Sequence, residues 1–454
     1  MILDRLPRGK APCEADFDFL NLMALDLNGE LRSVTMPKSY VSEKIFKEGI
    51  GFDASNYGYA KVTDSDMLIV PDPSVAFIEQ REGGRILHVM GDVFLSDGTF
   101  FEQYPRNVAR NALNFLRGQK MADGMKALVE LEFNVFDAVE YSADDTRVFY
   151  SVGSAEGLGE GFASRPRFGA HGGYHRFTPE DRYMDLRNHA VSLLEKIGFP
   201  VKYHHHEVGA SQLEIELEFM DMLKAADAVC LAKWIIRSVA GQMGLKATFM
   251  PKALYGMPGN GMHVHQFLEQ DGRSLFVGEG LYGLSKAGLS YIAGLLEHSL
   301  TGSLLAFTNP STNSYRRLIP GYEAPIGATF AKASRNAAVR IPGYLKKSET
   351  RMEYRTGDAT ANAYYMLSAM VLAGCDGILR QADPVALGFN SADGNVSKVF
   401  PLNLHRVLDG LEKDHEYLKP AFPSKLLELW NKHKRSEASY VYNAPTAQEY
   451  ELYF

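Results

Sequence analysis

The chain has 454 residues, of which 46% are hydrophobic and 23% are charged, and its formal net charge is -7. This acidic balance excludes a general electrostatic attraction to nucleic acids or anionic membranes, although clustered arginines can still bind small anions. The three cysteines form no CxxC pair and the N-terminus lacks an apolar leader, so we expect a cytoplasmic protein that is neither exported nor membrane-spanning.

The first part of the chain predicts a small domain rich in β-strands. Short strands separated by turn residues are expected over residues 19–27, 31–36, 67–70 and 85–94. Between them lies an irregular loop that carries Asp53, and an Asp in such a loop is usually a turn former. Pro105 then begins a predicted helix that ends near Arg117. We therefore place one domain at residues 14–104 and a larger one at residues 105–454.

In the run from 128 to 136, alternate residues fall on two faces: Leu128, Glu130, Glu132 and Asn134 on one, and apolar residues on the other. A strand would place Glu130 and Glu132 on one face and the apolar side chains on the other. Glutamates that face solvent need no explanation, so a surface face and a functional face both stay open.

Two further strand patterns carry acidic or imidazole side chains. Glu207 and Glu214 flank a short turn, and Glu214 and Glu216 alternate with apolar residues. The preceding histidines, 204–206, are neighbours on a strand and point to opposite faces, so at most two of them serve one site. After a glycine turn, His263 and His265 share a strand face, which is compatible with a satisfied core pair or with ligands.

Helices are expected over several segments of the larger domain, each with apolar residues at helical spacing. They are residues 178–197, with Thr178 as cap and Pro179 at the first helical position, and residues 221–243, 361–380, 404–417 and 424–434.

The segment from Asn309 to Arg355 is rich in arginine. Residues 309–325 predict a long ordered loop that offers Arg317 and Glu323. A strand over residues 351–355 would put Arg351, Glu353 and Arg355 on one face, and Arg335 and Arg340 lie between the two blocks. Guanidinium groups suit phosphates and carboxylates, and the alternative is a solvated basic face.

Carboxylates from several of these segments meeting in one cavity would repel by about 4 kcal/mol per close pair at an effective dielectric near ~20, so cations would have to fill it. Carboxylate ligands with a minority of imidazole suit Mg²⁺ or Mn²⁺. With arginines nearby, the pattern indicates phosphoryl transfer from a metal-bound nucleotide.

Two long motifs resemble one family over nearly the whole chain: NPSTNSYRRLIPGYEAP at residues 309–325 and GNGMHVHQ at residues 259–266. Both are similar to signatures of type I glutamine synthetases. The resemblance implies an α+β fold, with a small β-grasp-like N-terminal domain and a catalytic domain whose curved antiparallel sheet forms a half-barrel flanked by helices. It also implies a dodecamer of two hexameric rings, with active sites between neighbouring subunits.

The resemblance assigns roles residue by residue. It implies a first metal on Glu132, Glu207 and Glu214, and a second on Glu130, His263 and Glu353. Glutamate would be held by Arg317, Arg355 and Gly259, with Asn260 as a further contact, and the nucleotide by His265, Arg335, Arg340 and Arg351. The ammonium pocket would comprise Tyr174, Glu207, Glu323 and Asp53 of the adjacent subunit. The implied cofactors are ATP and two to three Mg²⁺ or Mn²⁺ ions.

The implied reaction is ATP-dependent ligation of ammonia to the γ-carboxylate of L-glutamate through γ-glutamyl phosphate, giving glutamine, ADP and phosphate. One alternative is a ligase of the same family that uses a larger amine, because His175 and Arg176 follow Tyr174 where the family usually has Phe and Pro. Another is a catalytically silent, ring-forming homologue, against which the complete set of expected ligands argues. Pro258 also departs from the family pattern, beside the predicted glutamate contacts.

Overall fold

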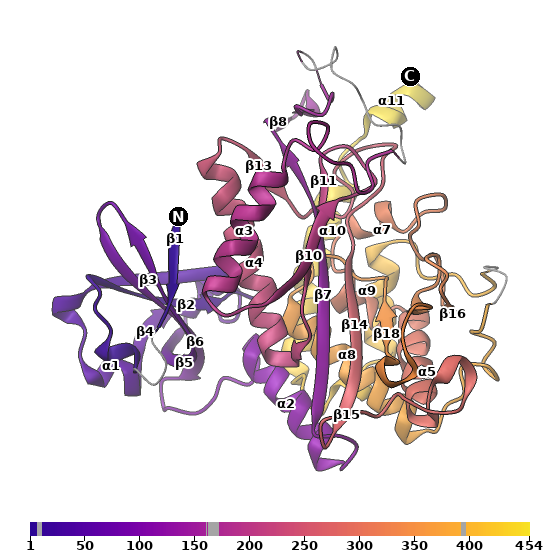
Figure 1. Cartoon of the computed structure of the whole chain (residues 1–454), viewed down its shortest axis with the longest axis horizontal. Helices are drawn as coiled ribbons and strands as arrows, with labels where there is room; N and C mark the ends of the chain where they lie inside the picture. The colour runs from indigo at the N-terminus through magenta and orange to yellow at the C-terminus, as the bar shows by residue number, and fades with distance from the viewer. Residues whose placement is uncertain (7–10, 160, 162–171, 392–395) are drawn as a thin grey trace.

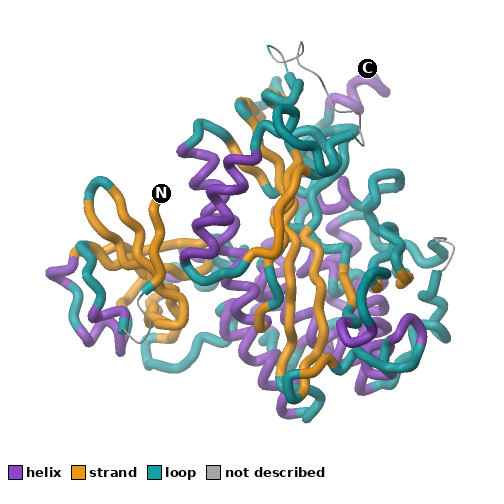
Figure 2. Tube along the Cα trace, viewed as in Figure 1, coloured by secondary structure: helices purple, strands orange, loops and turns teal. Residues whose placement is uncertain are grey.

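The computed structural model describes residues 1–6, 11–159, 161, 172–391 and 396–454. Its strands divide between a small sheet at one side of the molecule and a large sheet in its body (Figure 1). Helices cover the large sheet, and loops connect the strands at its upper end (Figure 2). Within these described ranges, no helix combines the length and apolar character needed to cross a membrane.

The small sheet has the strand order β1-β5-β6-β2-β3, with β4 paired to β5. Its strands are β1 (Ile2–Arg5), β2 (Phe19–Leu25), β3 (Leu31–Pro37), β4 (Ile50–Asp53), β5 (Asp66–Arg81) and β6 (Gly84–Leu95), and α1 (Glu43–Glu48) lies between β3 and β4. All of the strands predicted in this region are present. The strand expected at 67–70 is much longer, because β5 continues past Pro71 and Pro73 through an irregularity in its pairing with β6 between Asp72 and Ala76, where prolines are tolerated.

The large sheet has the order β10-β11-β7-β14-β18-β17-β16 and is antiparallel except for the β16–β17 pair. Its strands are β7 (Gly124–Phe136), β10 (Val201–His206), β11 (Gln212–Leu217), β12 (Met220–Asp221), β13 (Lys246–Thr248), β14 (Met262–Gln270), β15 (Arg273–Ser274), β16 (Phe330–Lys332), β17 (Val339–Ile341) and β18 (Met352–Tyr354). A separate hairpin joins β8 (Ala138–Ala143) to β9 (Val148–Gly153). The predicted α+β class, with a curved and largely antiparallel sheet, is confirmed.

One face of the large sheet is apolar and is covered by helices. On β7, Val129, Leu131, Phe133 and Val135 are at most 1% exposed, and α4 packs on this strand. The helices of the body are α2 (Pro105–Gly118), α3 (Met184–Lys196), α4 (Met222–Gln242), α5 (Lys286–Thr301), α6 (Leu305–Thr308), α7 (Ser314–Arg317), α8 (Ala363–Leu379), α9 (Leu404–Lys413), α10 (Ser424–Tyr442) and α11 (Ala447–Tyr453). The alternation of β7 therefore leaves its polar side chains on the opposite face.

Three predicted helix boundaries and one predicted loop differ from the structure. The helix expected over 424–434 continues to Tyr442 as α10. The helix expected from Thr178 begins only at Met184, because the Asp181 carboxylate accepts the Tyr183 N–H and pairs with Arg187, which holds the preceding residues in turns. The helix expected over 404–417 ends at Lys413 and is followed by a separate 3-10 turn. The predicted loop 309–325 contains the one-turn helix α7.

A buried arginine joins the small sheet to the helices of the body. Arg106, in the first turn of α2, is 0% exposed. Its Nε donates to Asp92 of β6 at 3.0 Å, one terminal nitrogen donates to Asp227 of α4 at 2.5 Å, and the other pairs with Asp72 of β5. Tyr364 of α8 donates to Asp227 at 2.6 Å. One guanidinium group thus fixes two strands and two helices relative to α2.

A second buried ion-pair cluster ties α5, α8 and α9 together. His298 lies between Asp376, at 3.0 Å, and Asp414, at 2.8 Å, and its ring stacks on Tyr417. Burial lowers the pKa of His298, but the hydrogen bonds to the two carboxylates outweigh it and raise the pKa above its ordinary value of 6.5. The pKa values of Asp376 and Asp414 are lowered, because their hydrogen bonds to His298 outweigh burial.

This cluster predicts a pH-dependent contribution to stability. The stabilisation from His298 is fully present below the unfolded pKa of 6.5 and is lost as pH rises through the raised folded pKa. The stabilisation from the two aspartates is present above 3.8 and is lost as pH falls through their lowered pKa values. We expect His298→Gln to cost roughly 2 kcal/mol in urea unfolding near ~pH 5.5, and clearly less near ~pH 8.5. Equal costs at the two pH values would contradict a charged His298.

Candidate active site

Acidic and imidazole side chains from four neighbouring strands share the polar face of the large sheet. The pairing registers place Glu214 opposite Glu132 and Glu216 opposite Glu130, between β11 and β7. On the other side of β7, His263 of β14 lies opposite Glu130. The next strand, β18, then places Glu353 opposite His265. Because side chains alternate along each strand, these registers bring segments more than two hundred residues apart onto one surface.

One cluster is centred on Glu130. Its two carboxylate oxygens accept hydrogen bonds from His263 Nδ1 and His265 Nε2, each at 2.8 Å. His263 Nδ1 also lies 4.0 Å from Glu353 and 3.6 Å from Glu132. The potential ligand atoms of Glu130, His263 and Glu353 lie within 4.8 Å of one another, and this is the set that the sequence predicts for the second metal.

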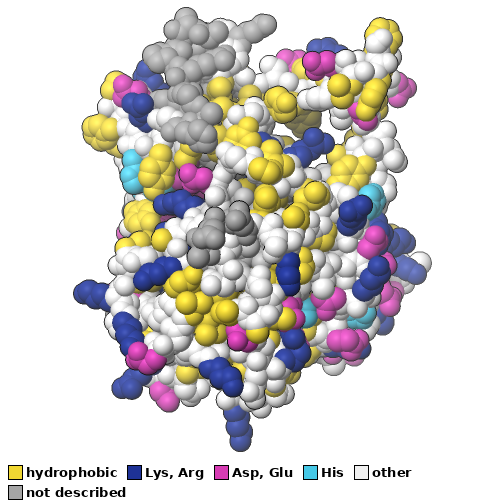
Figure 3. Space-filling view, turned by 90° about the vertical axis from the view of Figure 1, so that its right-hand side faces the viewer, with side chains coloured by type: hydrophobic (Ala, Val, Ile, Leu, Met, Phe, Trp, Pro, Cys, Tyr) yellow, Lys and Arg dark blue, Asp and Glu magenta, His cyan; other side chains and the backbone are white. Residues whose placement is uncertain are grey.

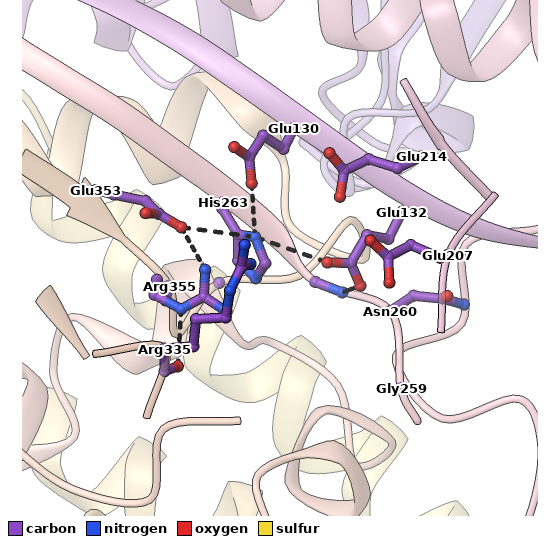
Figure 4. Close-up of polar contacts among 12 residues, drawn as sticks. Glu130, Glu132, Glu207, Glu214, Gly259, Asn260, His263, Arg335, Glu353 and Arg355 are labelled. Atoms are coloured by element: carbon purple, nitrogen blue, oxygen red, sulfur yellow. Dashed lines mark hydrogen bonds and ion pairs between the residues drawn. The ribbon is translucent and has the colours of Figure 1, made fainter. Parts of the chain in front are cut away.

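A second cluster lies around the turn between β10 and β11. His205, Glu207 and Glu214 offer ligand atoms within 4.8 Å of one another. Glu132, which is predicted to share a metal with the two glutamates, accepts the Gly261 N–H at 2.7 Å. Figure 4 shows the carboxylates of Glu132, Glu207 and Glu214 grouped on one side of His263, with Glu353 on its other side.

A third cluster combines Glu130 and His265 with Glu216, a residue to which the sequence assigns no role. Glu216 is 1% exposed, and one of its oxygens accepts from Lys202 Nζ at 2.6 Å. Its second oxygen is buried without a hydrogen-bond partner among the described residues. A buried carboxylate oxygen without a partner is costly, so this atom is suited to a cation.

Arginines surround the clusters. Arg340 donates to one oxygen of Glu353 at 2.6 Å, and Arg355 pairs with the other. Arg317 is 4% exposed and donates to His263 Nε2 at 3.2 Å and to the Thr356 carbonyl at 2.8 Å. Arg351 stacks over Phe219 and donates to His265 Nδ1 at 3.4 Å. The guanidinium groups therefore border the acidic face on its β17–β18 side.

The carboxylates are not equivalent electrostatically. Burial raises the pKa of Glu207 and of Glu214 well above the ordinary range, and neighbouring carboxylates raise both further. For Glu353, burial also raises the pKa, but Arg355 and His265 outweigh it and bring the pKa to about 2. For Glu130, His265 and His263 outweigh burial in the same way, and its pKa is lowered well below the ordinary range. The Glu207–Glu214 side is thus the one that lacks positive charge.

The donor set fits divalent cations. Mg²⁺ and Mn²⁺ accept a ligand set that consists mostly of carboxylate oxygens and includes a few imidazole nitrogens. The raised pKa values of Glu207 and Glu214 reflect negative charge that a bound cation would neutralise, and the unpartnered oxygen of Glu216 would gain a ligand bond. The residues present therefore fit metal binding.

A cavity of about 640 Å³ opens over this face. Most of the residues with predicted roles line it: Glu130, Glu132, Tyr174, Glu207, Glu214, Gly259, His263, Arg317, Glu323, Arg335, Arg340, Glu353 and Arg355. The volume is in the range of small-molecule sites.

The predicted residues that are not among those lining this cavity are Asp53, Asn260, His265 and Arg351. Asn260 is 1% exposed, and its amide donates to Asn134 at 2.7 Å and to the Met250 carbonyl at 2.9 Å. The amide thus joins β7 to the loop at Met250, and the contact between Asn260 and a substrate stays a prediction. Asp53 lies at the end of β4 in the small sheet, where it accepts from Ser55 N–H at 2.9 Å.

Several cavity residues were missed in the sequence. Tyr203 lines the cavity together with His205 and Glu207. Alternate positions on a strand share a face, so counting back from Glu207 in steps of two would have found Tyr203 and selected His205 among the three histidines. Lys202 and Gln212 border the same strands. Tyr322 and Tyr344 come from loops, where no periodic signal exists.

Comparisons with known proteins agree with this geometry. Residues 16–96 match the family described as glutamine synthetase, beta-Grasp domain, and residues 102–453 match glutamine synthetase, catalytic domain. Glutamine synthetase of Mycolicibacterium smegmatis is 38% identical over 97% of both chains, and that of Frankia alni is 37% identical over 97% of both. The solved glutamine synthetase of Plasmodium falciparum superposes with a TM-score of 0.87 at 26% identity, covering 97% of this chain and 96% of that one. The chain belongs to the glutamine synthetase family.

Proposed function

We propose that the protein ligates ammonia to the γ-carboxylate of L-glutamate at the expense of ATP, with γ-glutamyl phosphate as intermediate and glutamine, ADP and phosphate as products. The observation that carries the proposal is the convergence of Glu130, His263 and Glu353 with Glu207 and Glu214 in one arginine-bordered cavity. The relatives named above are glutamine synthetases, which supports the same reaction.

The chemistry needs charge neutralisation, because a carboxylate resists attack by an amine until it is activated. Two to three Mg²⁺ or Mn²⁺ ions would be held by the three ligand clusters, and such ions supply Lewis acidity and neutralise phosphate charge. In this proposal Arg340, Arg335 and Arg351 bind phosphate oxygens, and Arg317 and Arg355 bind the carboxylates of glutamate. The metal, nucleotide and glutamate roles assigned above are part of this proposal.

The amine would enter beside Glu207. Glu207, Tyr174 and Glu323 line the same cavity and present two carboxylates and a phenol, which suit an ammonium ion. Glu323 lies on a loop with a left-handed backbone conformation (φ 55°), at a position where it can cover the intermediate and exclude water. Asp53 of an adjacent subunit would remove the proton from ammonium, since Asp53 is exposed and lies away from the cavity of its own chain.

A multi-subunit assembly, with a dodecamer of two hexameric rings as its proposed form, is supported by apolar surface that a single chain leaves uncovered. Tyr141 and Tyr150 on the β8–β9 hairpin are 79% and 59% exposed, and Tyr453 and Phe454 at the end of α11 are 83% and 105% exposed. In Figure 1, α11 projects from the body at the end of the chain. Apolar groups gathered on projecting elements are typical of subunit contacts.

The domain division proposed at 14–104 and 105–454 is supported by the separate matches of the two family models and by the two sheets. Figure 3 shows one face of the larger part, with basic side chains dispersed among acidic and hydrophobic ones.

The thiols of Cys13, Cys230 and Cys375 are free, which fits a reducing cytoplasm.

A larger amine is the second candidate substrate. It is favoured by the rings of Tyr174 and His175, which stack with centroids 4.0 Å apart, and by His205, whose ring lies 4.7 Å from that of His175. Aromatic faces beside carboxylates suit organic ammonium ions.

Phosphate release in the presence of ATP, glutamate and one amine at a time tests the proposal. We expect ammonium to give the highest kcat/KM, with methylamine and a polyamine at least about 10-fold lower, because Glu207 and Glu323 favour a compact cation that donates several hydrogen bonds. A preference for methylamine or a polyamine would replace ammonia by the second candidate. If calorimetry shows no divalent-cation binding and no amine supports phosphate release, the chain is a silent homologue.

A further inference from the structure

The mechanism above leaves one buried carboxylate unused. Glu156 is 3% exposed, contacts the turn that joins β10 to β11, and is not among the residues that line the cavity. Its oxygens accept from three backbone or ring groups of different segments. Burying a carboxyl group costs desolvation energy, which these hydrogen bonds offset.

Glu156 holds both arms of the turn. One oxygen, Oε2, lies 3.0 Å from His206 Nε2 and accepts the Ser211 N–H at 2.5 Å. The other, Oε1, accepts the Arg182 N–H at 3.1 Å, from the segment that precedes α3. On its far side, the His206 ring donates from Nδ1 to the Glu207 carbonyl at 2.6 Å. The carboxylate is thus connected through one imidazole to the backbone of Glu207.

The Ser211 arm needs such support. Ser211 has φ 61°, a left-handed conformation that is unfavourable for a residue other than glycine. Its carbonyl accepts from the Val135 N–H at 2.9 Å, which joins the turn to the end of β7. Gln212, the first residue of β11, follows directly, and Glu214 comes two residues later on the same strand.

The turn holds Glu207 and Glu214 and also anchors the segment that contains Tyr174. The Glu207 N–H donates to the Gln212 carbonyl at 2.7 Å and closes the turn. The backbone N–H groups of Gly173 and His175 donate to the carbonyls of Val208 and His206, each at 3.0 Å, so the segment with Tyr174 is fastened to the same turn. A shift of this turn would therefore move Glu207, Glu214 and Tyr174 together.

We propose that Glu156 is a positioning residue that fixes the 207–214 turn, and thereby one of the two main cation sites and the amine-binding side of the cavity. The inference rests on the proposed function, because it assumes that Glu207 and Glu214 bind a cation. The Glu130–His263–Glu353 site does not depend on it, since those residues lie on β7, β14 and β18, whereas the side chain of Glu156 bonds to His206, Ser211 and Arg182.

Glutamine at position 156 has the right shape but the wrong hydrogen bonding. The Ser211 and Arg182 N–H groups both donate to the carboxylate, one to each oxygen. In either orientation, the NH₂ of a glutamine faces one of these donors. One orientation of the amide loses the Ser211 N–H, and the other loses the Arg182 N–H that ties Glu156 to the segment before α3. Glu156→Gln therefore removes one of the attachments of the turn while leaving the packing volume unchanged.

The fold offers a matched control. Glu79, in the small sheet, is a buried carboxylate 3.0 Å from His88 Nε2. Glu79→Gln changes a glutamate–histidine pair of the same kind without touching the large sheet. It reports how much of any effect comes from general destabilisation.

The experiment measures Mn²⁺ binding to the full-length, nucleotide-free protein by calorimetry, in a background that carries Glu353→Gln so that the cation on the Glu207–Glu214 side dominates. Adding Glu156→Gln is expected to lower the affinity for this Mn²⁺ ion at least about 10-fold, because loss of groups that orient metal ligands typically has an effect of this size. Glu79→Gln should leave it within about 2-fold. In the protein with Glu353 intact, Glu156→Gln should leave one Mn²⁺ of unchanged affinity.

Three outcomes overturn the proposal. If Glu156→Gln leaves both ions unchanged, the turn does not depend on it. If Glu156→Gln lowers the affinity for both Mn²⁺ ions equally, or if Glu79→Gln has the same effect, Glu156 has only a general structural role. If the unmodified protein binds no Mn²⁺, the proposed function fails with it, which distinguishes that failure from the first two.

Discussion

Replacement of Glu130 by glutamine is expected to lower kcat for phosphate release by about 10³-fold or more and to remove one Mn²⁺ from the protein. Glu130 lies at the centre of the acidic face, opposite both Glu216 and His263, and takes part in two of the three ligand clusters. An amide of the same size offers one neutral oxygen where the carboxylate offers two charged ones. No other residue on the face occupies the same two clusters among those described.

The matched control is Glu140→Gln, which changes an exposed carboxylate on β8 outside the cavity lining. Its kcat should stay within about 2-fold of the unmodified protein. Steady-state phosphate release and Mn²⁺ calorimetry on both variants are sufficient to compare them. Retention of a tenth or more of the activity by Glu130→Gln would remove Glu130 from the metal centre.

The largest effect on stability is expected at Arg106. Arg106→Leu leaves the buried Asp227 without its cation and leaves Asp72 and Asp92 with Arg110 alone. Removing one partner of a buried pair typically costs about 3–5 kcal/mol. Burial already raises the pKa of Asp227 even with the arginine present. We therefore expect the midpoint of urea unfolding to fall strongly, with the loss easing at low pH as the aspartates take up protons.

Arg32→Leu is the comparison for this experiment. Arg32 pairs with Asp26 at 2.9 Å, but its side chain is 55% exposed, so water screens the pair and its loss should cost at most about 1 kcal/mol. Urea unfolding followed by circular dichroism measures both variants. Equal, small losses would mean that α2 is anchored to the small sheet by apolar packing alone.

The local patterns of the site were predictable from the sequence, whereas their convergence was not. Strict alternation at residues 128–136 correctly put Glu130 and Glu132 on the face opposite the helices, because that pattern depends only on strand geometry. The pairing of Glu214 with Glu132 depends on the register between two strands nearly eighty residues apart, which no local pattern encodes. The family resemblance supplied that link, and the structure agrees with it.

The failures have local causes as well. Thr178 and Pro179 carry the signature of a helix start, but the tertiary pair between Asp181 and Arg187 delays the helix to Met184. The amide of Asn260 joins β7 to the loop at Met250, a tertiary contact that its motif did not indicate. Arg106 gave no signal, since a charged residue in the first turn of an amphipathic helix is ordinarily solvated.

The strands that carry the acidic and imidazole side chains are neighbours in one sheet, so their pairing registers decide how these side chains come together. Sliding β11 by a single residue against β7 would turn Glu214 and Glu216 into the apolar layer beneath and expose Leu213 and Ile215 in their place. The hydrophobic effect thus penalises every misaligned arrangement before any ion arrives. Folding itself sets the spacing of the carboxylate oxygen atoms. The cations therefore bind to a preorganised site and do not have to assemble it.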